Sequence, residues 1–160
     1  MINEEIISSA KHLVDLLAEK RKTVATAESC TGGMIGGSLT SVPGASEVYG
    51  FGFITYANEA KEKLLGVRHD TLLSHGAVSP ETAREMAEGA RKVSGADIAV
   101  AVTGIAGPGG GTPEKPVGLV YVGISTESGA WAEKLNLSGS RDEIRKQTVL
   151  AALRLTSNKI

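Results

Sequence analysis

An almost entirely apolar run, DIAVAVT at 97–103, is the feature that most constrains the fold of this chain. A strand with one face in water alternates apolar and polar residues, whereas a strand buried on both faces is apolar throughout. A strand of the second kind requires helices on both faces of its sheet. We therefore expect 97–103 to be a central strand of an α/β domain.

Helical and extended patterns alternate along the rest of the chain. Apolar positions recur at helical spacing in 4–20, and Ser79 followed by Pro80 marks another helix start. Further helices are expected from Gly32 to the turn at 43–44, at 58–65, at 69–75 and at 141–155, and further strands at 23–27, 48–56, 117–126 and 130–137. This order predicts one three-layer α/β/α domain over 1–160, whose mixed, mostly parallel sheet has about five strands.

Composition excludes several functional classes. The formal net charge is -1 and Lys and Arg are scattered, so we expect no nucleic-acid partner. The one cysteine, Cys30, allows no internal disulfide and no cysteine zinc cluster, and the histidines lack metal-binding spacing. We expect Cys30 to be a small buried residue rather than a nucleophile, and the protein to use no metal or cofactor. No apolar run approaches the roughly 20 residues that span a bilayer, which favours a cytoplasmic protein without a membrane partner.

The tract AESCTGGMIGG, 27–37, follows an expected strand and leads into a helix. Hydroxyls and glycines at such a junction present backbone N–H groups that can hold an anion, which predicts an oxyanion or phosphate cradle over residues 29–33. Ser29 and Thr31 are expected to face the chemistry, and Gly32 and Gly33 to hold the phosphate. The alternative is a helix cap with small residues that let the helix lie close to the sheet. The tract fits neither a Walker A loop nor G-x-G-x-x-G, which disfavours nucleoside triphosphates and dinucleotides.

A second glycine loop, TGIAGPGGG at 103–111, ends the apolar strand. Ligands of open α/β sheets bind beyond the carboxyl ends of strands, so Thr103 and Gly104 should lie beside the first tract. The loop matches no phosphate consensus, and a flexible connector is the alternative. Arg141, at the start of the last helix, could bind phosphate bidentately or lie on a solvated helix face.

The segment ITYANEAK, 54–61, places Lys61 near the third position of a helix for which Asn58 is the expected N-cap. A cation there opposes the helix dipole, and the same field favours the neutral amine. A neutral lysine can act as general base for a serine hydroxyl. An exposed lysine balanced by neighbouring glutamates is the alternative. Tyr56 could relay a proton or pack in the core.

Five segments in this order resemble the CinA C-terminal domain family: AESCTGG, PGAS to ITYANEAK, HGAVS, TGIAGPGGG and KPVGLV. The resemblance covers residues 5–155. Its members are nicotinamide-nucleotide amidohydrolases, so it implies hydrolysis of the carboxamide of nicotinamide mononucleotide to nicotinate mononucleotide and ammonia. Larger members carry an N-terminal domain, and this chain resembles the stand-alone form. We expect a homodimer.

The resemblance also implies roles for particular residues. Ser46 would be the nucleophile and Lys61 its base, with Tyr56 assisting proton transfer. Ser29 and Thr103 would orient the amide or its developing oxyanion.

The resemblance assigns phosphate binding to the glycine N–H groups and Arg141. Many members have Gly then Asp before this arginine, whereas this chain has Gly139 and Ser140. Whether Arg141 contacts the phosphate is therefore an open question at this point. Two other functions also remain open. One is an amidase for another phosphorylated amide, and the other is a non-catalytic nucleotide-binding or regulatory module.

Geometry complicates the pairing of Ser46 with Lys61. The two residues bracket the expected strand 48–56, which would span roughly 25 to 30 Å if straight. Either the loop at 43–47 folds back, the strand is shorter, or Ser46 comes from a second subunit. If Ser46 lies out of reach of Lys61, Ser29 becomes the better nucleophile.

Overall fold

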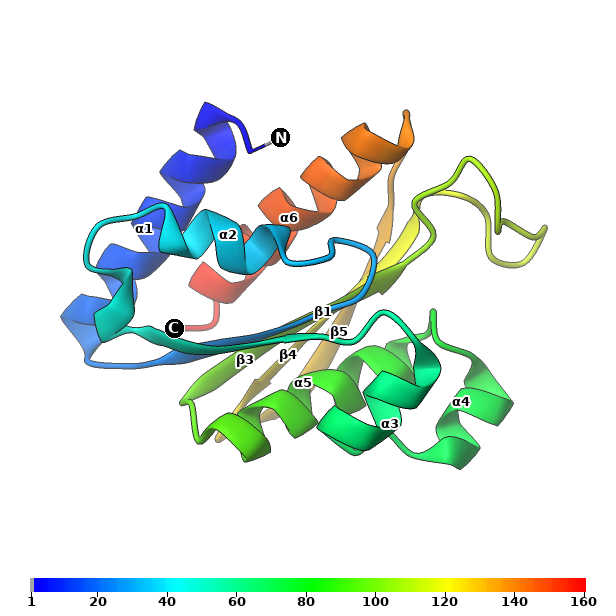
Figure 1. Ribbon diagram of the computed structural model, residues 1–160, viewed down its shortest axis with the longest axis horizontal. Helices are drawn as coiled ribbons and strands as arrows, with labels where there is room; N and C mark the ends of the chain where they lie inside the picture. Colours follow the sequence, from blue (N-terminus) through cyan, green and yellow to red (C-terminus); the bar gives the residue numbers. More distant parts are fainter. Residues whose placement is uncertain (1) are drawn as a thin grey trace.

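A computed structural model describes residues 2–160 and contains one sheet in the strand order β2-β1-β3-β4-β5 (Figure 1). Strand β1 pairs in parallel with β2 and β3, whereas β4 pairs antiparallel with β3 and β5. Four strands therefore share one direction, and the predicted mixed, mostly parallel sheet is confirmed. The strands are β1 Val24–Glu28, β2 Tyr49–Ile54, β3 Ile98–Gly104, β4 Leu119–Thr126 and β5 Gly129–Asn136.

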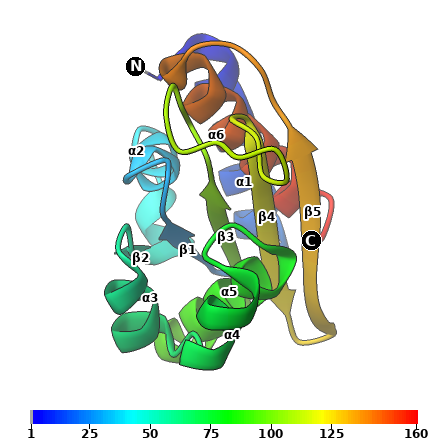
Figure 2. The same ribbon diagram turned by 90° about the vertical axis from the view of Figure 1, so that its right-hand side faces the viewer.

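Helices cover both faces of the sheet, which gives the three layers predicted from the sequence (Figure 2). One core lies between the sheet and the first group of helices, and a second lies between the sheet and the other group. The first group is α1 Glu4–Lys20, α2 Met34–Thr40 and α6 Arg141–Ser157, and the second is α3 Asn58–Leu65, α4 His69–His75 and α5 Pro80–Ser94.

The central position of β3 explains its apolar sequence. Its side chains alternate between the two cores, with Val100 and Val102 on the α1 and α6 side and Ala99 and Ala101 on the α5 side. All four are buried. Fully burying a valine contributes about 1.5–3 kcal/mol, so a polar substitution on either face of this strand would be costly. The small alanines allow α5 to lie close to the sheet.

Two expected boundaries around β2 differ from the structure. The strand ends at Ile54 and has six residues, so it is shorter than the expected strand 48–56. The N-cap of α3 is Ala57 rather than Asn58, and no side chain caps this helix. Lys61 is consequently the fourth residue of α3, and its amide makes the first helical hydrogen bond, to the Ala57 carbonyl at 3.2 Å.

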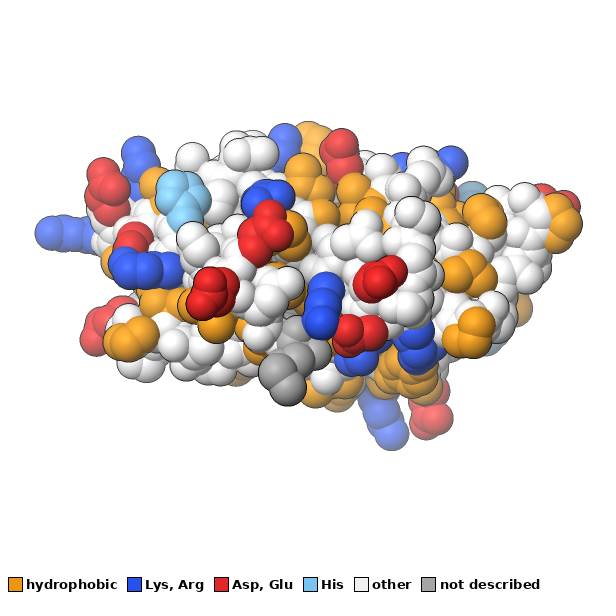
Figure 3. Space-filling model, turned by 90° about the horizontal axis from the view of Figure 1, so that it is seen from above, with side chains coloured by type: hydrophobic (Ala, Val, Ile, Leu, Met, Phe, Trp, Pro, Cys, Tyr) orange, Lys and Arg blue, Asp and Glu red, His pale blue; other side chains and the backbone are white. Residues whose placement is uncertain are grey.

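Acidic and basic side chains are interspersed on the outer face that α1, α2 and α6 form (Figure 3). This mixture agrees with the scattered charge of the sequence. None of the helices in 2–160 combines the length and the apolar content that crossing a lipid bilayer requires.

Helix α5 lies against the end of α3 at Gly89. A Cβ atom at this position would overlap the backbone carbonyl of Leu65, so the two helices can approach only because residue 89 has no side chain. This contact therefore holds α3, the helix that carries Lys61, against α5.

We expect Gly89→Ala to lower the free energy of unfolding by about 1–3 kcal/mol, because a helix must shift to admit the methyl group. The gain in helix propensity, at most about 1 kcal/mol, offsets only part of this loss. Urea denaturation measures the difference. Gly50→Ala is the control, because a Cβ there meets no atom within 4 Å. Equal midpoints for the two variants would contradict the close-approach argument.

Candidate active site

The carboxyl ends of β2, β1 and β3 meet at one edge of the sheet. In the parallel register Glu28 lies opposite both Ile54 and Val102, so the segments that follow these strands begin side by side. A pocket of about 280 Å³ opens there. It is lined by residues at or after the ends of these strands, by the segment at 77–78 and by the start of α6, namely Ser29, Cys30, Tyr56, Lys61, Ala77, Val78, Thr103, Gly104, Ile105, Ala106, Gly107, Gly109, Gly110 and Arg141.

The amine of Lys61 is the central group of this pocket. The residue is 1% exposed, and its Nζ donates to Ser29 Oγ at 3.1 Å. It also donates to the Thr55 carbonyl at 2.8 Å and to the Tyr56 carbonyl at 3.2 Å. Three acceptors match the three N–H groups of an ammonium, so the amine is held in one orientation.

Burial lowers the pKa of Lys61 from its ordinary 10.5 to about 8. Roughly a tenth of the amines are therefore neutral at pH 7. A neutral amine has a lone pair, to which the Ser29 hydroxyl can donate its proton across the 3.1 Å contact. Such a hydrogen-bonded pair is the arrangement of a base and its nucleophile. The sequence predicts a neutral amine from the field of the helix start, whereas the main physical cause is burial.

Cys30 adjoins Ser29 and is 6% exposed. Burial raises the pKa of its thiol from 9.0 to about 11, so the nucleophilic thiolate is scarce near neutral pH. Its side chain belongs to the core beneath α1, α2 and α6. The prediction of a buried residue is confirmed.

Ser46 does not reach Lys61 within one chain, so a pair of the two would require Ser46 from a second subunit. It is exposed in the short helix η1 Ala45–Glu47, which precedes β2. The register pairs the start of β2 with Val24 at the start of β1, whereas Lys61 follows the opposite end. Six strand residues extend about 20 Å, and no fold-back of the loop bridges that length. The serine that contacts Lys61 is Ser29, the alternative nucleophile.

The first glycine tract binds an anion of the protein itself. Glu28, 2% exposed, ends β1, and its carboxylate turns toward the start of α2. Its Oε1 accepts hydrogen bonds from Thr31 Oγ1 at 2.6 Å and from the Ile35 amide at 2.9 Å. Its Oε2 accepts one from the Gly36 amide at 3.0 Å. A carboxylate near a helix N-terminus is electrostatically favourable, and here it occupies the predicted position of a phosphate.

The residues predicted to form the cradle, Thr31, Gly32 and Gly33, lie outside this pocket, and anion binding by them stays a prediction. The hydroxyl of Thr31 faces Glu28, and the amide of Gly32 donates to the Ser29 carbonyl at 3.1 Å. The two glycines allow the backbone to turn between β1 and α2. Gly32 and Gly33 have φ of 57° and 105°, in the left-handed region that favours glycine.

Thr103 and Gly104 lie in the pocket wall, at the end of β3, as expected. The hydroxyl of Thr103 donates to the Ala77 carbonyl at 2.8 Å. The hydroxyl proton is used in this hydrogen bond to the segment before α5, so the Thr103 oxygen can accept a further hydrogen bond but not donate one. In this arrangement Thr103 holds a wall of the pocket and does not donate to an oxyanion.

Tyr56 and Arg141 form part of the pocket rim. Arg141 donates from Nη1 to the Gly107 carbonyl at 2.7 Å and from Nη2 to Tyr56 Oη at 3.2 Å. Tyr56 is 64% exposed, which excludes the core-packing alternative. Its hydroxyl contacts Arg141, and it is the Tyr56 carbonyl that contacts Lys61. The structure therefore gives the phenol no direct part in the Ser29–Lys61 pair.

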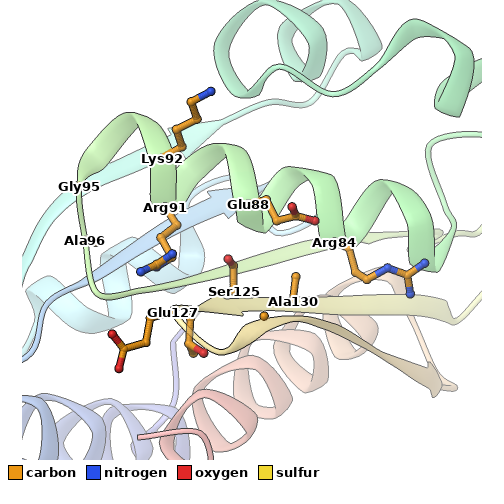
Figure 4. A pocket seen from close by; sticks show the side chains of 11 residues that line it. Arg84, Glu88, Arg91, Lys92, Gly95, Ala96, Ser125, Glu127 and Ala130 are labelled. Atoms are coloured by element: carbon orange, nitrogen blue, oxygen red, sulfur yellow. The ribbon is translucent and has the colours of Figure 1, made fainter.

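A larger cavity, of about 600 Å³, lies between α5 and the turn that joins β4 to β5 (Figure 4). Ser125 lines it and pairs with Ala99 at the amino end of β3, so this cavity opens at the opposite edge of the sheet. Among residues 2–160, no hydrogen-bonded nucleophile and base line it, nor do three His, Cys, Asp or Glu side chains gather anywhere as metal ligands. The Ser29–Lys61 pair makes the smaller pocket the candidate active site.

Sequence reasoning missed two residues that shape this site, Glu28 and Arg145. Arg145 donates from Nε to the Cys30 carbonyl at 3.0 Å and from Nη2 to the Thr31 carbonyl at 3.2 Å. A signal for Glu28 was present, because a carboxylate at the end of a buried strand requires partners. Arg145 gave no such signal, because basic residues on an amphipathic helix usually face solvent.

Residues 6–160 match the family model described as the CinA C-terminal domain. A competence-damage inducible protein of Caldanaerobacter subterraneus is 56% identical over 140 residues, which cover 88% of this chain and 34% of that protein. One of Caldicellulosiruptor bescii is 55% identical over 148 residues, which cover 92% of this chain and 36% of that protein. The chain thus spans about a third of the length of these curated relatives.

Solved structures agree with these sequence matches. The competence/damage inducible protein CihA of Agrobacterium tumefaciens is 45% identical with a TM-score of 0.94, and the match covers 97% of this chain and 95% of that one. A CinA superfamily protein of Klebsiella pneumoniae is 31% identical with a TM-score of 0.93, covering 96% of both chains. On the family match and these relatives, the chain belongs to the CinA C-terminal domain family.

Proposed function

We propose that this chain hydrolyses the carboxamide of nicotinamide mononucleotide to nicotinate mononucleotide and ammonia. The observation that carries the proposal is the buried Lys61 amine, 3.1 Å from Ser29 Oγ in a pocket with Arg141 at its rim. A hydroxyl beside a base of lowered pKa suits acyl transfer from an amide. Family membership supports the choice of substrate, because the family resemblance implies this activity.

The first half of the reaction would acylate the serine. Neutral Lys61 takes the proton of the Ser29 hydroxyl as Oγ attacks the carboxamide carbon, and a tetrahedral oxyanion forms. The Lys61 ammonium then returns this proton to the amide nitrogen. The carbon–nitrogen bond breaks, ammonia leaves, and the nicotinoyl group remains as an ester on Ser29.

The second half would hydrolyse that ester. Lys61, neutral again, takes a proton from water while the water oxygen attacks the ester carbon. The tetrahedral intermediate collapses, the proton returns to Ser29 Oγ, and the carboxylic acid leaves, losing its proton to solvent. Both halves use the same pair of residues and consume one water in total.

Backbone N–H groups of the second glycine loop could supply the hydrogen bonds to negatively charged oxygens. Four pocket-lining residues, Ala106, Gly107, Gly109 and Gly110, have N–H groups for which residues 2–160 provide no backbone acceptor. Such groups stabilise a developing oxyanion or a phosphate. The guanidinium of Arg141, on the same rim, would add a charged contact to the phosphate.

We expect Ser29→Ala and Lys61→Met each to lower kcat/KM for ammonia release from nicotinamide mononucleotide by roughly 10²- to 10⁴-fold. Each variant removes one member of the pair. The assay contains a chelator, and circular dichroism verifies folding. Ser46→Ala is the matched control, because Ser46 is exposed beyond the other end of β2, and it should leave the rate unchanged. Loss of activity in Ser46→Ala with retention in Ser29→Ala would assign the nucleophile to Ser46 instead.

The rate should depend on pH through the lowered pKa of Lys61. The base must be neutral, so kcat/KM should rise about tenfold per pH unit at low pH and level off above a pKa of about 8. The residual activity of Lys61→Met should lack this ascending limb. A wild-type rate that falls as pH rises through the same region would contradict a lysine base.

Arg141→Gln should raise KM for nicotinamide mononucleotide by roughly 10- to 100-fold, because a charge-assisted hydrogen bond is lost, and leave kcat nearly unchanged. Nicotinamide riboside has the same amide without the phosphate, and its kcat/KM should not respond. Arg154→Gln is the control on the same helix, where the side chain pairs with Glu5 at 2.8 Å. An unchanged KM for the nucleotide would exclude Arg141 from phosphate binding.

A further inference from the structure

We infer that Glu28 and Arg145 are positioning residues that together hold the nucleophile against its base. Between them they fix the Ser29 loop, residues 29–33, from its two sides. The inference rests on the proposed function, since it assumes that Ser29 reacts. It assigns both residues a role in turnover rather than in substrate binding.

Glu28 holds the loop through the start of α2. Its carboxylate is buried and accepts hydrogen bonds from Thr31 within the loop and from Ile35 and Gly36 beyond it. A buried carboxylate is stable only while it is hydrogen-bonded. Movement of the loop would break the 2.6 Å contact with the Thr31 hydroxyl and leave this charge with fewer partners.

Arg145 holds the loop from α6. Its planar guanidinium donates to the carbonyls of Cys30 and Thr31, the two residues that follow Ser29. Two donors on one rigid group fix both the position and the direction of this short backbone segment. Arg141 lies one helical turn earlier and contacts the opposite wall at Gly107, so Arg141 and Arg145 have different tasks.

Lys61 is fixed independently of these contacts. Its amine also donates to the carbonyls of Thr55 and Tyr56, which follow β2. Loss of the Glu28 or Arg145 contacts would therefore move Ser29 while the base stays in place. Small displacements of a nucleophile from its base are costly to the chemical step and leave binding groups elsewhere intact. The expected signature is a fall in kcat at constant KM.

The test measures kcat and KM for ammonia release from nicotinamide mononucleotide in Arg145→Lys, Glu28→Gln and Thr31→Val. We expect kcat to fall by roughly 10- to 100-fold in each, with KM and the pH of the ascending limb unchanged. Thr31→Ser keeps a hydroxyl that can donate a hydrogen bond to Glu28, so its kcat should be close to that of wild type. Arg154→Lys, on the exposed part of α6, is the control and should match wild type.

Several outcomes would overturn the inference. A raised KM with wild-type kcat in Arg145→Lys would make Arg145 a substrate contact. Should Glu28→Gln fail to fold, Thr31→Val decides, because it removes a single hydrogen bond at nearly constant volume. A folded Thr31→Val with wild-type kcat would show that the contact does not position Ser29.

Labelling of Ser29 by a fluorophosphonate, followed by mass spectrometry, separates this inference from the proposed function. A wild type that releases no ammonia, yet is labelled faster than the three variants, would refute the substrate and support the positioning role. Equal labelling rates would overturn the positioning role. A wild type that is neither active nor labelled would overturn both.

Discussion

Burial of the Lys61 amine is the constraint on which the rest of the site depends. An ammonium taken out of water needs acceptors on all sides, and here they are one hydroxyl and two backbone carbonyls. The parallel pairing of β1 with β2 supplies them, because it brings the residues after Glu28 beside the residues after Ile54. The close packing of α3 against α5 at Gly89 holds the helix that carries Lys61. The chemistry of the pocket thus follows from the sheet register and from one helix contact.

The sequence is a good guide to the fold because burial on both faces leaves a visible pattern. The apolar run at 97–103 predicts β3, and helical periodicity predicts the layers on either side. It is a poorer guide to the site. Ser46 and Lys61 lie close together along the chain but at opposite ends of β2, and only the sheet register reveals that Ser29, 32 residues from Lys61, is the near neighbour.

The first glycine tract shows a second limit of sequence reasoning. Glycines and hydroxyls before a helix indicate that an anion is bound but not which anion. Here Glu28 provides it from within the same tract, and the side-chain direction that allows this depends on the turn at Gly32 and Gly33. The role of Arg145 could not be predicted for a related reason. Its side chain donates to backbone carbonyls more than a hundred residues earlier, and such a contact produces no pattern in the sequence around Arg145.

The buried state of Cys30 has a consequence for the chemical durability of the protein. Oxidants and alkylating agents attack thiolates, and a thiol with a pKa of about 11 offers few of them at neutral pH. This is the chain's only sulfhydryl, and it lies next to the serine that contacts Lys61. The peptide segment that carries Ser29 is therefore protected from thiol oxidation, by burial of the same kind that lowers the pKa of the neighbouring Lys61 amine.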